Sequence, residues 1–351
     1  MINFFKFIFT TLIIHFHRKT NQAVDFEMRG NQKKKILIIA YDALGDFIIA
    51  SPLFQQLKVR FNYAELHLLA SERNTDLAKQ YGWFQKIWSV QLNTIFFDQN
   101  HWKKIREIQE SRYDLVINLF DEPDDVAISK ILFIAKSSQF LSLDLRPKSF
   151  FQKLQLLQFK KFFSNRKFFA YPAQSGLHFL ERMYKICEFW SNAVAVDFKY
   201  IFPEIKSLPA TEKIYFHPFG SQKNNCLSLE AVKSITATIG ENNYILPALK
   251  NRFTGEALRA HYPQSENFKN FFELAEKMKS CKAVISVDTA TAHLAIALGK
   301  PLFLIRANEA WREGFDPHVG KFLIFKSDNN KIESLDLRRL QSELRKFISQ
   351  I

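Results

Sequence analysis

Two stretches of the chain combine residue types that could do chemistry with turn positions that could present them. One runs from Asp288 to His293, after the apolar run 283–287 and before a short stretch of small residues. Asp288 and Thr289 are residue types that cap helices, and a helix N-terminus offers free N–H groups and partial positive charge to a diphosphate. An ordinary structural cap with His293 packed in the core is the commoner meaning of such a stretch.

The second stretch is the polar turn 41–46, which follows the buried run 36–40. It holds two carboxylates, Asp42 and Asp46. A carboxylate beside a substrate hydroxyl can take its proton as general base. The same side chain can also cap the helix that follows, and for Asp42 this structural role is the more common one.

The elements that must position these residues alternate between short apolar strands and amphipathic helices, which predicts parallel α/β sheets. The sequence favours two Rossmann-like domains facing a cleft, with ligands at the carboxyl ends of the strands. Expected strands are 36–40, 65–70, 87–90, 113–119, 214–218, 243–247, 283–287, 302–305 and 322–325; expected helices are 47–58, 74–81, 102–110, 126–135, 178–190, 229–239, 256–261, 270–279, 289–298 and 332–348.

The chain length predicts two domains, since a chain of 351 residues is longer than those that usually fold around a single hydrophobic core. We place an apolar and basic extension at 1–32, a first domain at 33–205 and a second at 206–351, with Pro203 and Pro209 near the boundary. Three widely spaced cysteines form no CxxC pair and suggest a reducing compartment.

A net charge of +14 predicts an anionic partner, such as a nucleic acid, a membrane surface or a phosphorylated substrate. No nucleic-acid-binding motif is evident, so no nucleic-acid partner is expected. The apolar run 1–16 is shorter than a bilayer span, and a basic cluster follows it. It fits an interfacial helix on an anionic membrane and, about equally, a helix covering an apolar patch of its own protein.

Several common sites are disfavoured by missing motifs. Neither domain carries GxGxxG after its first strand, and no GxxxxGK[ST] occurs. No His, Cys or carboxylate group has metal-ligand spacing, so no metal is expected. His217 stands at a strand end and is interpreted as structural.

Three blocks together resemble glycosyltransferase family 9, the heptosyltransferases of lipopolysaccharide core assembly. The run Asp42–Lys58, with its Gly-Asp, its proline six residues later and its Leu-Lys, resembles the family's N-terminal signature. The stretch Asp288–Pro301 is similar to the C-terminal signature, and 214–229, with His-Pro-x-Gly-Ser, is similar to the segment between them. The blocks fall in family order and span nearly the whole chain from Lys33.

The resemblance implies a GT-B fold and an inverting, metal-independent transfer from a nucleotide-diphospho-sugar, with no cofactor and with ADP-heptose as the expected donor. It assigns the catalytic base to Asp46. The predicted donor and diphosphate residues are Ser221, Lys223, Asp288, Thr289, Ala290, Thr291 and His293.

The chain departs from the family at one position. Family members carry a lysine or arginine after the Gly-Ser turn, and here that position is Asn225. Lys223 lies two residues earlier; Arg252 or Arg306 could instead supply the cation.

The resemblance further implies an acceptor that is a lipid-anchored, anionic lipopolysaccharide or lipooligosaccharide core. We therefore expect a cytoplasmic protein at the inner face of the inner membrane, although a run of basic residues is usually only a solvated face. Candidate acceptor residues are Gly45, Arg60, Lys160 and Lys161, with Lys148 and Arg166 as further basic candidates.

Three alternatives remain beside heptose transfer. One is a family member with a different donor sugar, and another is a nucleotide-sugar epimerase of the same fold, for which the expected acidic and histidine groups are not found as a set. The third is a non-catalytic nucleotide-sugar or polysaccharide-binding protein, which the asparagine at 225 favours.

Overall fold

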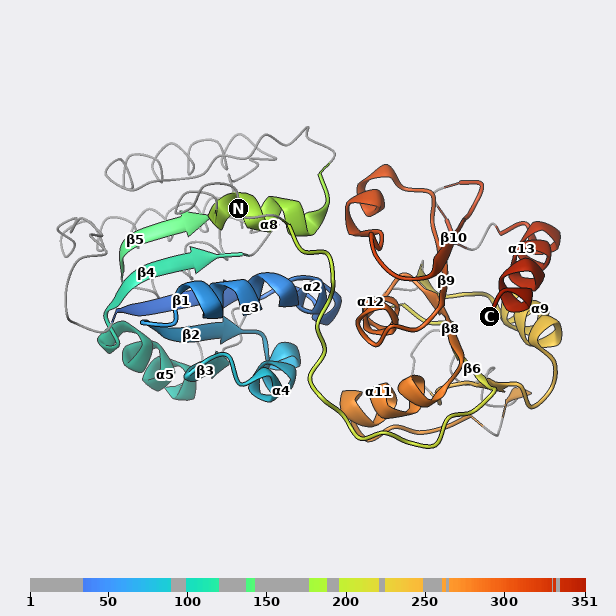
Figure 1. The fold of residues 1–351 in the computed structure, drawn as a ribbon, viewed down its shortest axis with the longest axis horizontal. Helices are drawn as coiled ribbons and strands as arrows, with labels where there is room; N and C mark the ends of the chain where they lie inside the picture. Colours follow the sequence, from blue (N-terminus) through green and yellow to red (C-terminus); the bar gives the residue numbers. More distant parts are fainter. Residues whose placement is uncertain are drawn as a thin grey trace. The chain divides into compact units, whose positions relative to one another are not determined.

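The computed structural model describes residues 34–89, 99–119, 137–142, 177–187, 196–220, 225–248, 261–262, 265–329, 331–332 and 335–351. The chain divides into two compact units, Met1–Asp197 and Phe198–Ile351, whereas the sequence places the domain boundary after residue 205. Each unit contains a five-stranded sheet, and the strand pairs described are parallel (Figure 1).

The first unit has the strand order β3-β2-β1-β4-β5. Its central strand is an unbroken apolar run, Ile36–Ala40, whose residues are all buried, as expected for a parallel strand covered on both faces. The elements are β1 Lys35–Ala40, α2 Leu44–Ile49, α3 Ser51–Arg60, β2 Glu65–Ala70, α4 Glu72–Tyr81, β3 Lys86–Ser89, α5 Gln99–Glu110, β4 Tyr113–Asn118, β5 Ser137–Ser142 and α8 Phe179–Cys187.

The helix expected at 47–58 begins earlier and is divided in two. α2 begins at Leu44, and Ala50 joins it to α3. Pro52 lies in the first turn of α3, where the N–H that proline lacks would have no partner within the new helix. The proline therefore ends the first hydrogen-bonded ladder while allowing a second helix to start at once.

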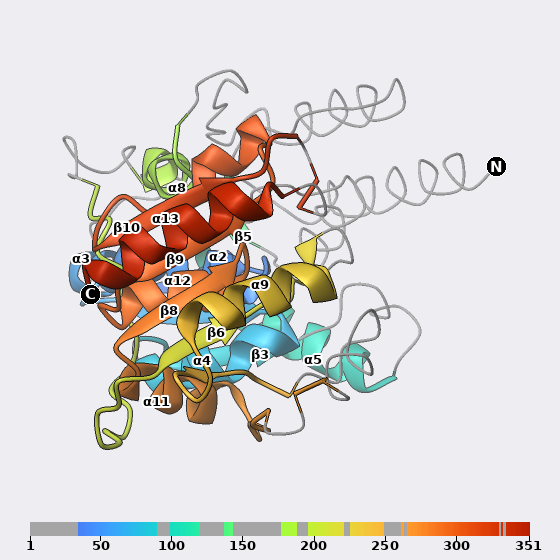
Figure 2. The same cartoon turned by 90° about the vertical axis from the view of Figure 1, so that its right-hand side faces the viewer.

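The second unit repeats the arrangement, with strand order β10-β9-β8-β6-β7. α9 and α13 pack together over one face of its sheet, and α12 covers the other (Figures 1 and 2). The elements are β6 Ile214–His217, α9 Leu229–Ile239, β7 Tyr244–Ile245, α11 Phe271–Ser280, β8 Ala283–Val287, α12 Ala290–Ala297, β9 Leu302–Arg306, the 3-10 helix η3 Ala310–Phe315, β10 Phe322–Lys326 and α13 Leu337–Ser349.

The terminal helix starts five residues later than the apolar pattern suggests. Asp336 caps it by accepting hydrogen bonds from the N–H groups of Arg338 and Arg339. Leu340 and Leu344 then bury the apolar stripe in the core of the second unit. The helix expected at 126–135 lies outside the described residues, as does nearly all of that at 256–261.

Both sheets reverse their strand order beside their first strand. The reversal lies between β1 and β4 in the first unit and between β6 and β8 in the second. Ligands of open parallel sheets bind outside the carboxyl ends of the strands at such a reversal. No helix among the described residues is long and apolar enough to cross a membrane.

Candidate active site

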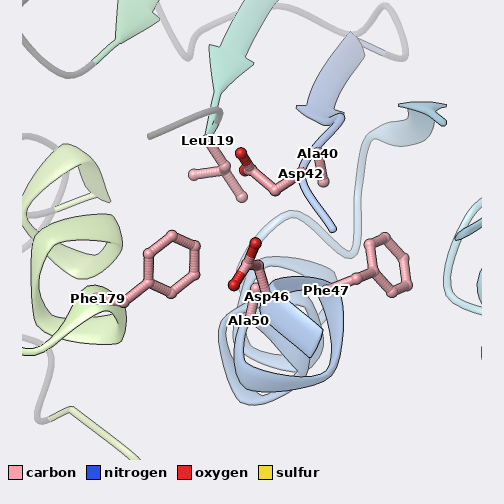
Figure 3. Close-up of a pocket in the computed structure, with 7 residues that line it drawn as sticks. All are labelled: Ala40, Asp42, Asp46, Phe47, Ala50, Leu119 and Phe179. Carbon is pink, nitrogen blue, oxygen red and sulfur yellow. The ribbon is translucent and has the colours of Figure 1, made fainter. Parts of the chain in front are cut away.

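A narrow pocket opens at the strand-order reversal of the first unit. Its empty volume is about 200 Å³, which includes the space at its mouth that is open to solvent. The carboxylates of Asp42 and Asp46 border it, and the Phe179 ring of α8 lies across from Asp46 (Figure 3). The full lining is Ala40, Asp42, Asp46, Phe47, Ala50, Leu119 and Phe179.

Asp46 combines the two roles that the sequence left open. It stands in the first turn of α2, and its Oδ2 accepts a hydrogen bond from the backbone N–H of Ala43 at 3.2 Å. That bond is a local cap for the helix start. The carboxylate is also half-buried against a mainly apolar pocket wall, where a substrate hydroxyl could approach it.

The turn that carries Asp46 is tied to α4. The Nδ2 group of Asn74 donates to the backbone carbonyl of Asp42 at 2.9 Å, and Asn74 is fully buried. Gly45 is buried beside Asp46 in the first turn of α2. The sequence singled out neither Asn74 nor Phe179, because nothing in a single chain marks which helix faces a given turn.

Of the two predicted acceptor residues that the structure describes, Gly45 adjoins the pocket-lining Asp46, whereas Arg60 does not. Arg60 is the last residue of α3, which runs back from the Asp46 turn toward the start of β2. It therefore lies near the amino ends of the strands, whereas the pocket lies at their carboxyl ends. Lys148, Lys160, Lys161 and Arg166 fall outside the described residues.

In the second unit, the sequence correctly predicts a strand, a capped turn and a short helix. Thr289 is the N-cap of α12, and its Oγ1 accepts from the N–H of Thr291 at 3.1 Å. Asp288, Thr289 and Ala290 are partly exposed, whereas the Thr291 side chain is buried. The tip of α12 thus stands at the carboxyl end of β8 with its first residues accessible.

Two histidines near this edge are buried as neutral imidazoles. Burial lowers the pKa of His217, at the end of β6, to about 4. Burial also lowers the pKa of His293, against a smaller opposing effect of the Asp288 carboxylate. The His293 ring packs edge-on against Tyr200, with ring centres 6.2 Å apart. This placement agrees with the packing role considered for His293 and the structural role for His217.

Arg306 is committed to its own loop. Its side chain is 1% exposed, its Nη2 donates to Asp316 Oδ2 at 2.7 Å, and its Nη1 donates to the Ala307 carbonyl at 3.1 Å. The alternative in which Arg306 supplies the diphosphate cation is therefore not supported by this geometry. The guanidinium instead ties the end of β9 to Asp316, the residue that follows η3.

The turn after β6 closes tightly on Gly220. A Cβ at this position would lie 2.4 Å from the Asn225 Cβ and 2.7 Å from the Asn225 carbonyl oxygen. Glycine is required by this close approach. The predicted Ser221 and Lys223, together with the alternative Arg252, fall outside the described residues, and their roles stay predictions.

Within the described ranges, no group of three or more His, Cys, Asp or Glu side chains could hold a metal ion. The expectation that transfer needs no metal stays a prediction.

The fold is similar to those of several solved glycosyltransferases. A family 9 glycosyl transferase from Veillonella parvula DSM 2008 superposes with a TM-score of 0.70 at 14% identity, covering 93% of this chain and all of that one. The chain has the GT-B fold of the family 9 glycosyltransferases. E. coli heptosyltransferase WaaC with ADP superposes with a TM-score of 0.67 at 14% identity, covering 89% of this chain and 99% of that one. E. coli ADP-heptose heptosyltransferase II superposes with a TM-score of 0.63 at 13% identity, covering 90% of this chain and 99% of that one.

The GT-B fold confirms the prediction of two Rossmann-like α/β domains. No family model matches the sequence, and no curated protein matches it either. Likeness at 13–14% identity establishes the fold alone.

Proposed function

We propose that this protein is an inverting, metal-independent glycosyltransferase. It transfers heptose, or a related sugar, from an ADP- or other nucleotide-diphospho-sugar to a lipopolysaccharide or lipooligosaccharide core. The observation that carries the proposal is the Asp46 carboxylate bordering a pocket at the strand-order reversal of a GT-B fold. An inverting transfer needs one base beside the acceptor hydroxyl, and a half-buried carboxylate can serve as that base.

The second unit supports the donor half of the proposal. Charge builds on the departing diphosphate, and oriented N–H groups at a helix tip stabilise such charge. The accessible start of α12, capped by Thr289, offers these groups, and Asp288 would contact the sugar or hold the loop. The solved structures of E. coli WaaC are with ADP and with ADP-2-deoxy-2-fluoro heptose, which favours a nucleotide-sugar donor here.

We also propose a membrane-bound acceptor and a site of action at the cytoplasmic face of the inner membrane. The support is electrostatic, because a chain with net charge +14 is attracted to anionic lipid surfaces and to anionic core oligosaccharide.

Turnover with defined substrates tests the proposal. The full chain is incubated with ADP-heptose and a core acceptor truncated before its heptose, and product is followed by mass spectrometry and ADP release. Asp46→Asn should lower kcat by about 10²- to 10⁴-fold while nucleotide affinity, measured by calorimetry, is retained. Asp76→Asn is the matched control, since Asp76 is an 80%-exposed carboxylate of the same unit. Full activity in Asp46→Asn would refute the assignment.

A second candidate is a non-catalytic nucleotide-sugar-binding protein, which is favoured by Asn225 standing where the family has a cation. Binding of ADP-heptose with no turnover on any core acceptor would support it. Turnover with a UDP-sugar but not with ADP-heptose would instead show that the protein is a glycosyltransferase with a different donor.

A further inference from the structure

One peptide group connects a buried side chain of α4 to the proposed catalytic carboxylate. This group consists of the Asp42 carbonyl and the Ala43 N–H. Its carbonyl accepts from Asn74 Nδ2 at 2.9 Å, and its N–H donates to Asp46 Oδ2 at 3.2 Å. Both ends of the same rigid plane are therefore held, one by a helix of the scaffold and the other by the carboxylate.

The chemistry of Asn74 indicates that this bond is the reason for a polar residue here. The partner is a carbonyl oxygen, which only accepts, so the atom facing it must be the amide nitrogen. The Oδ1 atom of Asn74 is buried and has no hydrogen-bond partner among the described residues. A buried amide oxygen left unpaired is costly, and an apolar side chain would fill the position without that cost. The hydrogen bond from Asn74 Nδ2 to the Asp42 carbonyl offsets this cost.

We infer that Asn74 is a positioning residue that orients Asp46 through the Asp42–Ala43 peptide group. The inference rests on the proposed function, since it assigns Asn74 a part in the same transfer. When the carbonyl is released, the peptide plane can rotate and carry the Ala43 N–H away from Asp46. The carboxylate then loses one of the interactions that orient its plane, the 3.2 Å bond from Ala43. Small displacements of a reacting group cost up to about 100-fold in rate.

The first test removes the side-chain donor. Asn74→Leu and Asn74→Ala should lower kcat by about 10- to 100-fold. The donor KM and the nucleotide Kd should remain within about twofold, because the predicted donor residues lie in the other unit. Thr75→Ala is the matched control: it removes a hydrogen bond of the same helix turn, from Thr75 Oγ1 to the Ser71 carbonyl at 3.0 Å, without touching the Asp46 turn.

The second test removes the backbone donor and remains decisive if the Asn74 variants fold poorly. Ala43→Pro deletes the N–H that binds Asp46, and the φ of Ala43, −64°, already suits proline. Ala43 is exposed, so the ring has space. Ala43→Gly keeps the N–H and is its control. Ala43→Pro should reproduce the selective loss of kcat, and Ala43→Gly should not.

The outcomes separate this inference from the proposed function. A wild-type chain without transferase activity refutes the proposed function. An active wild type with unchanged kcat in folded Asn74→Leu or in Ala43→Pro refutes the positioning role alone. A loss of kcat matched in Thr75→Ala and Ala43→Gly also refutes it, because a general loosening of the turn would then explain the effect.

Discussion

The buried pair of Arg306 and Asp316 makes a prediction that links stability to the donor site. In Asp316→Ala, the Arg306 guanidinium, 1% exposed, loses the carboxylate that its Nη2 contacts at 2.7 Å. Removing one partner of a buried ion pair costs about 3–5 kcal/mol, because the remaining charge stays buried without compensation. In a unit of this size, each kcal/mol of lost stability lowers the melting temperature by about 2–4 °C. Asp316→Ala should therefore lower the melting temperature by about 6–20 °C.

Replacing both partners should be far less harmful. Burial raises the pKa of the Asp316 carboxyl even though the Arg306 guanidinium opposes this shift, so desolvation outweighs pairing on the carboxylate side. Such pairs can often be exchanged for apolar residues at little cost. The double variant Arg306→Met, Asp316→Leu should therefore melt close to the wild type.

Calorimetric melting and nucleotide titration of the full chain, with both variants and the wild type, check this reasoning. The expected result is a large loss of stability in Asp316→Ala, recovery in the double variant, and near-wild-type ADP affinity in the recovered protein. A recovered melting temperature with nucleotide binding abolished would mean that Arg306 contacts the diphosphate, and would refute its purely structural role. A melting temperature unchanged in Asp316→Ala would contradict the burial argument itself.

Two further predictions concern the second unit. Burial lowers the pKa of His217 from 6.5 in the unfolded chain to about 4 in the folded protein, so the unfolded chain takes up a proton first as the pH falls. The folded protein should therefore lose about 3 kcal/mol of stability between about pH 6.5 and pH 4. Urea unfolding across that range should show the free energy of unfolding falling with pH, and His217→Phe should reduce that pH dependence. Gly220→Ala places a methyl group 2.4 Å from the Asn225 Cβ and should displace Asn225, which lowers both the melting temperature and the nucleotide affinity. Gly82→Ala in the first unit is the control: its φ of +64° is unfavourable for alanine, but nothing lies within 4 Å of the added methyl group. This variant should therefore lower stability without changing nucleotide affinity.

The elements that could be predicted from the sequence are those whose signals are local. Ile36–Ala40 and 283–287 are apolar runs bounded by turn residues, and they form the central strands β1 and β8. The stop of α12 follows from Gly299, which adopts φ +67° just past the helix. The strand Ser137–Ser142 was not predicted, because this edge strand has only two large apolar residues and no alternating pattern.

The candidate site was predictable only in part, for a related reason. Asp46 and Thr289 follow buried strands directly, so their places at the carboxyl edges are readable from the chain. Asn74 and Phe179 reach the pocket region from helices distant in sequence, and only the packed fold shows that they do. Arg306 could be suggested as a cation from its charge, but its burial and its pairing with Asp316 are tertiary facts.

The charges of the second unit indicate how a leaving diphosphate would be stabilised. His217 and His293 are neutral because burial lowers their pKa values, and Arg306 is occupied by Asp316. Among the described residues at the carboxyl ends of β6, β8 and β9, this leaves the N–H groups at the start of α12 as the source of positive potential. Backbone dipoles do not titrate, so that contribution stays constant across neutral pH. A pH dependence of transfer at constant donor affinity would then report on the acceptor side, where Asp46 borders its pocket.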